Sequence, residues 1–201
     1  MINTDLIQEN DLDHLKKILK YAENVKSNFD QIIKSLFPEN MVVCGPIKEI
    51  NSIIKKAKYR KNTIPENIQD IVRAMIICPT YEDALNVKTK VFNNFNVLNM
   101  EDFFQKMSLT GFRDINIKIN FQEFVVEILI ILEDFYNLEQ EKTRKVYDKI
   151  KKLLENQKIE KDLIIELMTD NLILFNETIK KYNSKTDGVK LPVWDINQLN
   201  I

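Results

Sequence analysis

The chain is poor in the residues that most nucleophilic enzymes and metal centres need. Among 201 residues it has one histidine, His14, and two cysteines, Cys44 and Cys78. Because His14 lies in a polar N-terminal segment and no second histidine exists, Ser-His and Cys-His catalytic schemes lack their base. Both cysteines lie in apolar, strand-like runs without metal-ligand spacing, so we expect buried free thiols rather than a disulfide.

Excess charge and long apolar runs are also lacking. The formal net charge is −1, so the whole molecule has no general attraction for nucleic acid, and any basic surface must be local. No apolar segment is long enough to span a bilayer, and the polar, acidic N-terminus does not resemble a signal peptide. With 44% hydrophobic and 29% charged residues, the sequence predicts a globular cytoplasmic protein without membrane contact.

Hydrophobic periodicity predicts one α/β (α+β) domain, a mixed five-stranded sheet flanked by helices, with N-terminal and C-terminal helical extensions. Apolar residues recur at helical spacing over residues 5–36, 49–60, 81–92, 133–156 and 159–181. Short apolar or alternating runs predict strands over residues 41–44, 71–78, 95–98, 112–119 and 124–132. The last two strands are expected to form a hairpin. The predicted units are an N-terminal extension, the α/β domain, and a C-terminal helix with its tail, over residues 1–40, 41–155 and 156–201.

The most apolar run of the chain, Phe124 to Leu132, contains one carboxylate, Glu127, near its centre. A β-branched run of this kind is typical of a strand buried on both faces. An ionised carboxylate there would lose on the order of several kcal/mol of solvation unless a metal, a cation or a ligand meets it. Glu127 therefore marks the place where a functional site is expected.

Two other segments carry charges that suit such a site. Lys48, Ser52 and Lys56 are four residues apart, so a helix would place two ammonium groups and a hydroxyl on one face, as phosphate oxygens require. Asp70 opens a buried strand, where a carboxylate can hold a divalent cation. Arg73, inside that strand, needs an anionic partner. The plainer alternatives are a solvated basic helix face and a turn aspartate.

A glycine turn precedes the alternating strand and completes the set. Thr110 to Asp114 leads into a run in which isoleucines occupy one face, while Asp114, Asn116 and Lys118 occupy the other. Glu127 follows on the next strand, within reach of this polar face.

In order and spacing these motifs resemble the RelA/SpoT-type (p)ppGpp synthetase domain, of the nucleotidyltransferase superfamily, over about residues 42–150. The matching segments are Lys48-x-x-x-Ser52-x-x-x-Lys56, Asp70-Ile-Val-Arg-Ala-x-Ile-Ile, Gly111-Phe112-Arg113-Asp114, Val126-Glu127-Ile128-Leu129 and Lys145-Val-Tyr147-Asp148. The resemblance implies a Mg²⁺-dependent pyrophosphokinase. Such an enzyme transfers pyrophosphate from ATP to the 3′-hydroxyl of GDP, GTP or another nucleotide, making an alarmone of the stringent response.

The resemblance also implies roles for single residues. Lys48, Ser52 and Lys56 match the stretch that grips the ATP phosphates. Asp70 matches the Mg²⁺-binding aspartate. Glu127 matches the glutamate that binds the metal or activates the attacking hydroxyl.

On the acceptor side, Phe112 takes the place of the tyrosine that stacks on the acceptor base. Arg73, Arg113 and Asn116 are further candidate substrate-binding residues, at positions where this sequence has its own pattern.

The sequence departs from the family pattern at several positions. Pro46 replaces an arginine, Leu129 replaces a glutamine, and the usual Tyr-x-x-x-His element is Phe112 to Asn116. Arg73 lies two positions before the usual arginine, whose place Met75 takes. These departures favour a divergent branch, which makes an alarmone or modifies another nucleotide or an RNA end. The alternatives are a catalytically degenerate member that binds nucleotide or protein, and a helical module that forms homo-oligomers.

Overall fold

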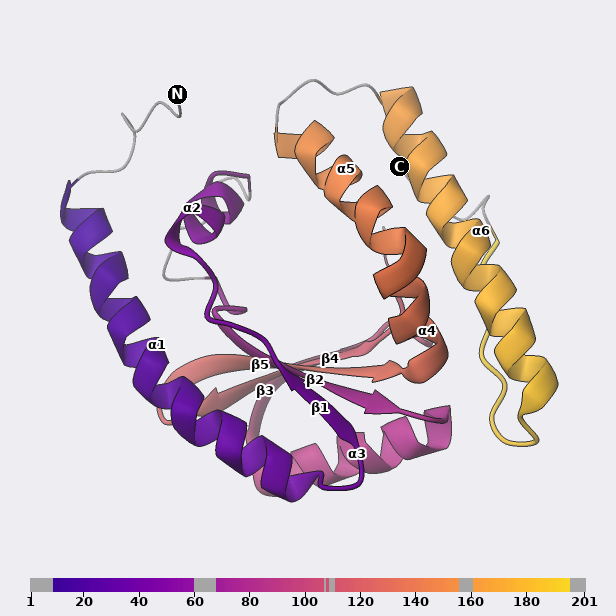
Figure 1. The fold of residues 1–201 in the computed structure, drawn as a ribbon, viewed down its shortest axis with the longest axis horizontal. Helices are drawn as coiled ribbons and strands as arrows, with labels where there is room; N and C mark the ends of the chain where they lie inside the picture. The colour runs from indigo at the N-terminus through magenta and orange to yellow at the C-terminus, as the bar shows by residue number, and fades with distance from the viewer. Residues whose placement is uncertain (1–8, 60–67, 107, 109–110, 156–160, 196–201) are drawn as a thin grey trace.

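A computed structural model describes residues 9–59, 68–106, 108, 111–155 and 161–195. It confirms the expected class, because five strands form one mixed sheet with helices packed on it (Figure 1). The expected helix ends at residues 5, 60, 156 and 159 lie outside the described residues.

The sheet has the strand order β1-β2-β5-β4-β3, and β2 and β5 are its one parallel pair among the described residues. Runs of β-branched and other apolar residues form the two central strands, which are the most buried. The strands are β1 (Met41–Cys44), β2 (Val72–Cys78), β3 (Asn96–Asp102), β4 (Ile115–Phe121) and β5 (Phe124–Leu132).

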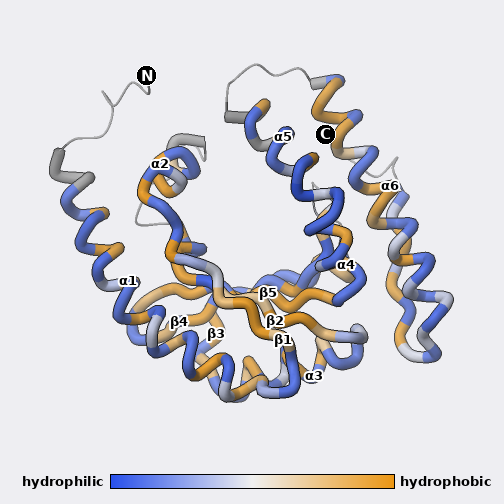
Figure 2. The backbone as a smooth tube through the Cα atoms, in the orientation of Figure 1, coloured by the Kyte–Doolittle hydropathy of each residue, from blue (hydrophilic) through white to orange (hydrophobic). Residues whose placement is uncertain are grey.

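One face of the sheet is apolar and covered by two helices. α1 (Glu9–Leu36) and α3 (Tyr81–Asn94) lie against it (Figure 1), and the strands that they cover are largely orange, hydrophobic, in Figure 2. Every second residue of a strand faces this layer, so Ile115, Ile117 and Ile119 of β4 are all fully buried. Thr80 caps the N-terminus of α3 and forms a capping box with Asp83.

The opposite face carries the polar residues of the central strands. α2 (Ile50–Tyr59) stands over one side of this face, and α4 (Glu133–Leu138) and α5 (Arg144–Glu155) over the other (Figure 1). α6 (Lys161–Lys185) packs outside α4 and α5, where Ile150, Ile164 and Met168 form a small second core.

Two expected elements differ in the structure. The helix expected over residues 133–156 is interrupted by a π-helical turn, η2 (Glu139–Thr143), so that α4, η2 and α5 follow one another. The strand expected from residue 112 begins at Ile115. Ile115 is the first residue of this segment that has register partners, Asp102 on β3 and Ile130 on β5.

The predicted hairpin of β4 and β5 is confirmed. Phe121 pairs with Phe124, so the turn consists of Gln122 and Glu123, with φ angles of 51° and 61°. Positive φ at both central residues is the geometry of a type I′ turn. The Tyr21 hydroxyl donates to the Gln122 carbonyl at 2.6 Å, which ties the turn to α1.

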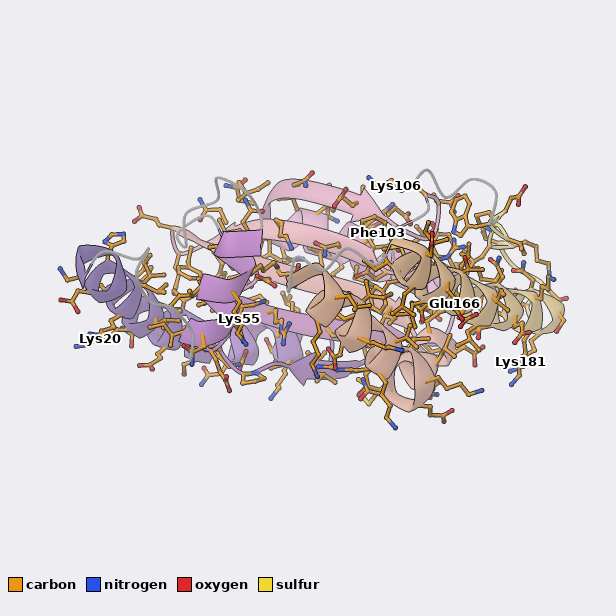
Figure 3. All side chains as sticks on the ribbon, turned by 90° about the horizontal axis from the view of Figure 1, so that it is seen from above. Lys20, Lys55, Phe103, Lys106, Glu166 and Lys181 are labelled. Carbon is orange, nitrogen blue, oxygen red and sulfur yellow. The ribbon has the colours of Figure 1, made fainter. Side chains whose placement is uncertain are left out.

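The surface features agree with the sequence. Lysines such as Lys20 on α1 and Lys181 on α6 lie on the outside of the helices (Figure 3). Both cysteines are free thiols, but only Cys78 is buried as expected, which raises its pKa to about 12, whereas Cys44 is half-buried. Within the part of the chain that the structure describes, no helix combines the length and the hydrophobicity needed to cross a membrane.

Candidate functional site

The centre of the polar face is a row of charges that crosses three strands. Arg73 of β2 and Lys118 of β4 are the register partners of Glu127 on β5. Side chains of directly paired residues lie on the same face of a sheet. Glu127 therefore has a cation on each neighbouring strand, and the sheet register itself builds this part of the site.

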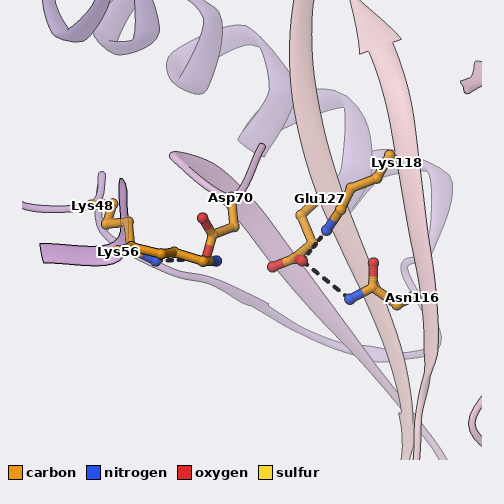
Figure 4. Close-up of polar contacts among 6 residues, drawn as sticks. All are labelled: Lys48, Lys56, Asp70, Asn116, Lys118 and Glu127. Atoms are coloured by element: carbon orange, nitrogen blue, oxygen red, sulfur yellow. Dashed lines mark hydrogen bonds and ion pairs between the residues drawn. The ribbon is translucent and has the colours of Figure 1, made fainter. Parts of the chain in front are cut away.

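The carboxylate of Glu127, 8% exposed, has two partners on β4. Lys118 forms an ion pair with its Oε1 atom, and Asn116 Nδ2 donates to the same atom at 3.1 Å (Figure 4). The second oxygen points away from both, toward the side on which Asp70 lies (Figure 4). The solvation lost by Glu127 is thus partly replaced by a lysine and an amide, and one oxygen is left for another contact.

Asp70 forms the second half of the site, in the turn before β2. Its Oδ2 atom accepts from Lys48 Nζ at 2.5 Å and Lys56 Nζ at 2.6 Å, while Oδ1 is buried and has no hydrogen-bond partner among the described residues. Burial alone would raise the pKa of this carboxyl. Attraction to Lys56 and hydrogen bonds from both lysines outweigh burial and hold the pKa well below its usual range.

The two lysines reach Asp70 from different kinds of structure. Lys56 lies on α2, but Lys48 lies before the helix, which begins at Ile50. The Lys48 backbone N–H donates to the Ile71 carbonyl at 3.1 Å, so the β1–α2 connection runs beside the start of β2. This corrects the expectation that Lys48, Ser52 and Lys56 share one helix face. Ser52 lies half-buried in the first turn of α2.

Arg73 lies at the same face, beside Glu127 in the sheet register, and its charge also acts on Glu139 in the interrupted helix. A Cβ atom on Gly45 would approach Arg73 Nε to 3.2 Å, so the glycine leaves room for the arginine side chain. Glu139, in η2, is half-buried, and burial raises its pKa. Arg144 and Arg73 attract its charge and lower the pKa in part. The π-helical turn therefore places a carboxylate near Arg73.

The structure places the remaining predicted residues in two environments. Asn116 belongs to the Glu127 cluster, whereas Arg113 is 1% exposed and lies under the Trp194 ring in the core. Phe112 is half-buried and packs edge-to-face on Phe175 of α6, with 6.1 Å between ring centroids.

Three site residues were not among the predicted ones: Lys118, Asp114 and Glu139. The polar face of the alternating strand was the signal for Lys118 and Asp114, whereas nothing in the sequence indicated Glu139. Burial, followed by repulsion from Glu127, raises the pKa of Asp114 well above its usual range. Asp114 therefore holds its proton at pH values where an exposed aspartate has lost it.

Two carboxylate oxygens of the site could serve as ligands of a divalent cation. Asp70 offers a buried, unpartnered oxygen, and Glu127 offers its second oxygen. Within the described residues, no group of three or more His, Cys, Asp or Glu side chains converges as a metal cage. Mg²⁺ usually takes one or two protein carboxylates and completes its shell with phosphates and water, which agrees with this pair.

Comparison with known proteins supports the fold. No protein-family model and no curated protein matches the chain. Small alarmone synthetase 1 from Bacillus subtilis, solved with its product pppGpp, aligns with a TM-score of 0.61 at 17% identity, over 86% of this chain and 98% of that one. A second structure of that synthetase, bound to AMPCPP, aligns with a TM-score of 0.50 at 18% identity, over 89% and 100%.

A third solved structure is similar. Small alarmone synthetase 2 from Bacillus subtilis aligns with a TM-score of 0.56 at 22% identity, over 87% of this chain and 98% of that one. At these identities the likeness establishes the architecture. The chain thus has the fold of the small alarmone synthetases, over nearly the full length of each, with a charged site on the open face of its sheet.

Proposed function

We propose that the protein is a Mg²⁺-dependent pyrophosphokinase of the (p)ppGpp synthetase type. It transfers pyrophosphate from ATP to the 3′-hydroxyl of an acceptor, which is GDP, GTP or another nucleotide. The observation that carries the proposal is the pair Asp70 and Glu127, two buried carboxylates on the open polar face of the sheet, with Lys48 and Lys56 beside them. The likeness to a synthetase solved with pppGpp supports this choice of reaction.

The site residues have distinct chemical tasks in this reaction. Lys48 and Lys56 lie where two ammonium groups can neutralise phosphate charge, and Arg73 adds a third cation on the same face. Lys118 and Asn116 hold one oxygen of Glu127, which leaves the other either to hold Mg²⁺ or to accept the proton of the attacking 3′-hydroxyl.

Asp70 and Glu127 would hold Mg²⁺, which supplies charge neutralisation on the pyrophosphate oxygens when bound. The low pKa of Asp70 keeps this carboxylate ionised throughout the physiological range. Phe112 is the candidate for stacking on the acceptor base, and a nucleotide with another base, or an RNA end, remains compatible with the ring.

One observation favours a second candidate, a nucleotide-binding or protein-binding member without catalysis. The charges at Asp70 and Glu127 are already paired with lysines, so the fold does not need a metal to compensate them. Pro46, where the family has arginine, removes one cation on the phosphate side.

A product assay with Glu127→Gln tests the first proposal. The protein is incubated with Mg²⁺, radiolabelled ATP and, in separate reactions, GDP, GTP, ATP or tRNA. The wild type is expected to form a labelled product, and Glu127→Gln to reduce its rate by at least about 100-fold, because general-base catalysis contributes about that much or more. The matched control is Glu123→Gln, an exposed glutamate in the turn of the same hairpin, which should retain the wild-type rate.

Circular dichroism of Glu127→Gln should match that of the wild type, so that loss of product reflects chemistry. A fully active Glu127→Gln variant would mean that another group takes the proton. Nucleotide binding in calorimetry, combined with no transfer by the wild type, would instead establish the non-catalytic candidate.

A further inference from the structure

Residues 186–195, which we call the C-terminal strap, run back along α6 and are fastened to it at two points. The Asn183 side chain donates to the Leu191 carbonyl and accepts from the Leu191 N–H, both at 2.8 Å. Asn176, two helical turns earlier, does the same with Trp194, at 2.7 and 3.1 Å. Because the strap advances as the helix numbers fall, the two run antiparallel, side by side in Figure 1.

The strap ends on a buried cation. The Trp194 ring lies over the guanidinium of Arg113, with 4.4 Å from Cζ to the ring centroid. Arg113 Nη1 donates to the Phe104 carbonyl at 3.4 Å, while Nε and Nη2 have no partner among the described residues. Burial lowers the pKa of Arg113 to about 9, so the side chain is still a cation at neutral pH. No carboxylate is hydrogen-bonded to this guanidinium in the described part of the chain, and besides the Phe104 carbonyl the indole face of Trp194 lies against it.

The segment that contains Arg113 is also pressed against α6. Gly111 has a φ of 74°, and a Cβ atom there would lie 3.3 Å from the Leu172 Cα atom, so only glycine permits this approach. Phe112 packs on Phe175 of the same helix. Residues 111–113 are therefore held from two directions, by α6 and by the strap that α6 carries.

This segment leads directly into the candidate site. Asp114 follows Arg113, is 2% exposed, and senses the charge of Glu127. Two residues later, Asn116 donates to the Glu127 carboxylate. Arg113 is therefore only three residues before a side chain that contacts Glu127. Because Arg113, Asp114 and Ile115 are all buried, this stretch has little room to absorb a displacement of Arg113.

We propose that the C-terminal strap sets the position of residues 111–116 at the site, and that Trp194 is a positioning residue that acts through Arg113. Trp194 touches neither Glu127 nor Asp70. Its contribution is to retain the Arg113 side chain in the core, so that the chain leaving Arg113 presents Asn116 to Glu127. The effect on nucleotide binding rests on the proposed function, whereas the effect on the segment itself rests on the contacts alone.

Hydrogen exchange measured by mass spectrometry tests the positional effect without any nucleotide. Trp194→Ala removes the ring over Arg113, and exchange in a peptide covering residues 111–118 should accelerate at least tenfold, while a peptide covering β2 exchanges as in the wild type. Trp194→Phe retains an aromatic face and should restore most of the protection. The matched control is Val193→Ala, because Val193 is in the same strap but 46% exposed, and it should exchange like the wild type.

A second pair of variants tests the attachment of the strap to α6 separately from the Trp194 ring. Asn176→Ala removes both hydrogen bonds to the Trp194 backbone and leaves the side chains of Trp194 and Arg113 chemically unchanged. It should reproduce the exchange pattern of Trp194→Ala to a smaller extent, whereas Asn183→Ala, which loosens the strap at Leu191, should have a weaker effect. Unchanged exchange over residues 111–118 in both Trp194→Ala and Asn176→Ala overturns the proposal.

Calorimetry with GTP and Mg²⁺ supplies the functional measurement. GTP affinity should fall about tenfold in Trp194→Ala, recover in Trp194→Phe and stay unchanged in Val193→Ala. Faster exchange with wild-type GTP affinity would overturn the role of the strap at the site and leave the proposed function standing. If the wild type binds no GTP, the guanine acceptor of the proposed function fails, while the exchange data still decide whether the strap holds the segment.

Discussion

Removing the two lysines that contact Asp70 should have a strongly non-additive effect on stability. The side chains of Asp70, Lys48 and Lys56 are 10%, 13% and 24% exposed, so their charges interact with little screening by solvent. Lys48→Met or Lys56→Met removes one charge-assisted hydrogen bond, about 1.5–3 kcal/mol, but relieves repulsion between two ammonium groups on one oxygen. We expect each single variant to lose about 1 kcal/mol of unfolding free energy.

The double variant Lys48→Met/Lys56→Met leaves a buried, uncompensated carboxylate. Breaking a buried ion pair by removing its partner costs about 3–5 kcal/mol, and we expect a loss in that range. Adding Asp70→Asn removes the charge and should recover most of it. The matched control is Lys55→Met, since Lys55 is the neighbouring lysine on α2 and is exposed (Figure 3).

The pH dependence of the same variants follows from the pKa of Asp70. In the wild type this pKa is lowered, so the ion pairs stabilise the fold above the pKa of an unfolded aspartate, about 4, and this contribution is lost as the pH falls through the folded-state pKa. In the double variant burial acts alone and raises the pKa, so its penalty is present at neutral pH. The difference between the two proteins should therefore shrink below about pH 4.

Urea unfolding followed by circular dichroism at pH 7 and pH 3.5 measures these effects. A double variant that loses no more than the sum of the singles, or that loses equally at both pH values, would refute the reasoning. Either result would mean that Asp70 keeps its solvation, or a further partner, when both lysines are gone.

Two further predictions concern Asp114 and the hairpin turn. The pKa of Asp114 is raised, so the fold loses stability as the pH rises from the unfolded-state pKa toward the folded-state pKa. Asp114→Asn should therefore raise Tm at pH 7 and flatten the decline in Tm between pH 4 and 7. An unchanged profile would show that this carboxyl is solvated. Glu123→Gly places glycine at a φ of 61°, where a side chain is strained, and should raise the free energy of unfolding in urea by about 0.5–1 kcal/mol. A lower free energy of unfolding would mean that the Glu123 side chain stabilises the turn by more than the relief of backbone strain.

The sequence alone predicted the elements and the segments in which a candidate site was expected. Apolar periodicity of 3.6 or 2 residues reports which face of a helix or strand is covered, so it predicted the mixed sheet and the β4–β5 hairpin to within a few residues. The same physics predicted that Glu127 has a partner, because a carboxylate within an apolar strand requires one wherever the strand lies, and Lys118 and Asn116 supply it.

Only the tertiary structure decided what those residues meet. Lys48 lies 22 positions from Asp70, and no local pattern links them. Arg113 has the charge of a substrate-binding residue, yet α6 and the strap cover it. The ring that lies over it belongs to Trp194, which is more than 80 residues further along the chain. The π-helical turn that places Glu139 near Arg73 likewise leaves no mark in the periodicity of residues 133–156. Local sequence encodes which side chains must leave water, whereas their partners depend on the packing of elements distant along the chain.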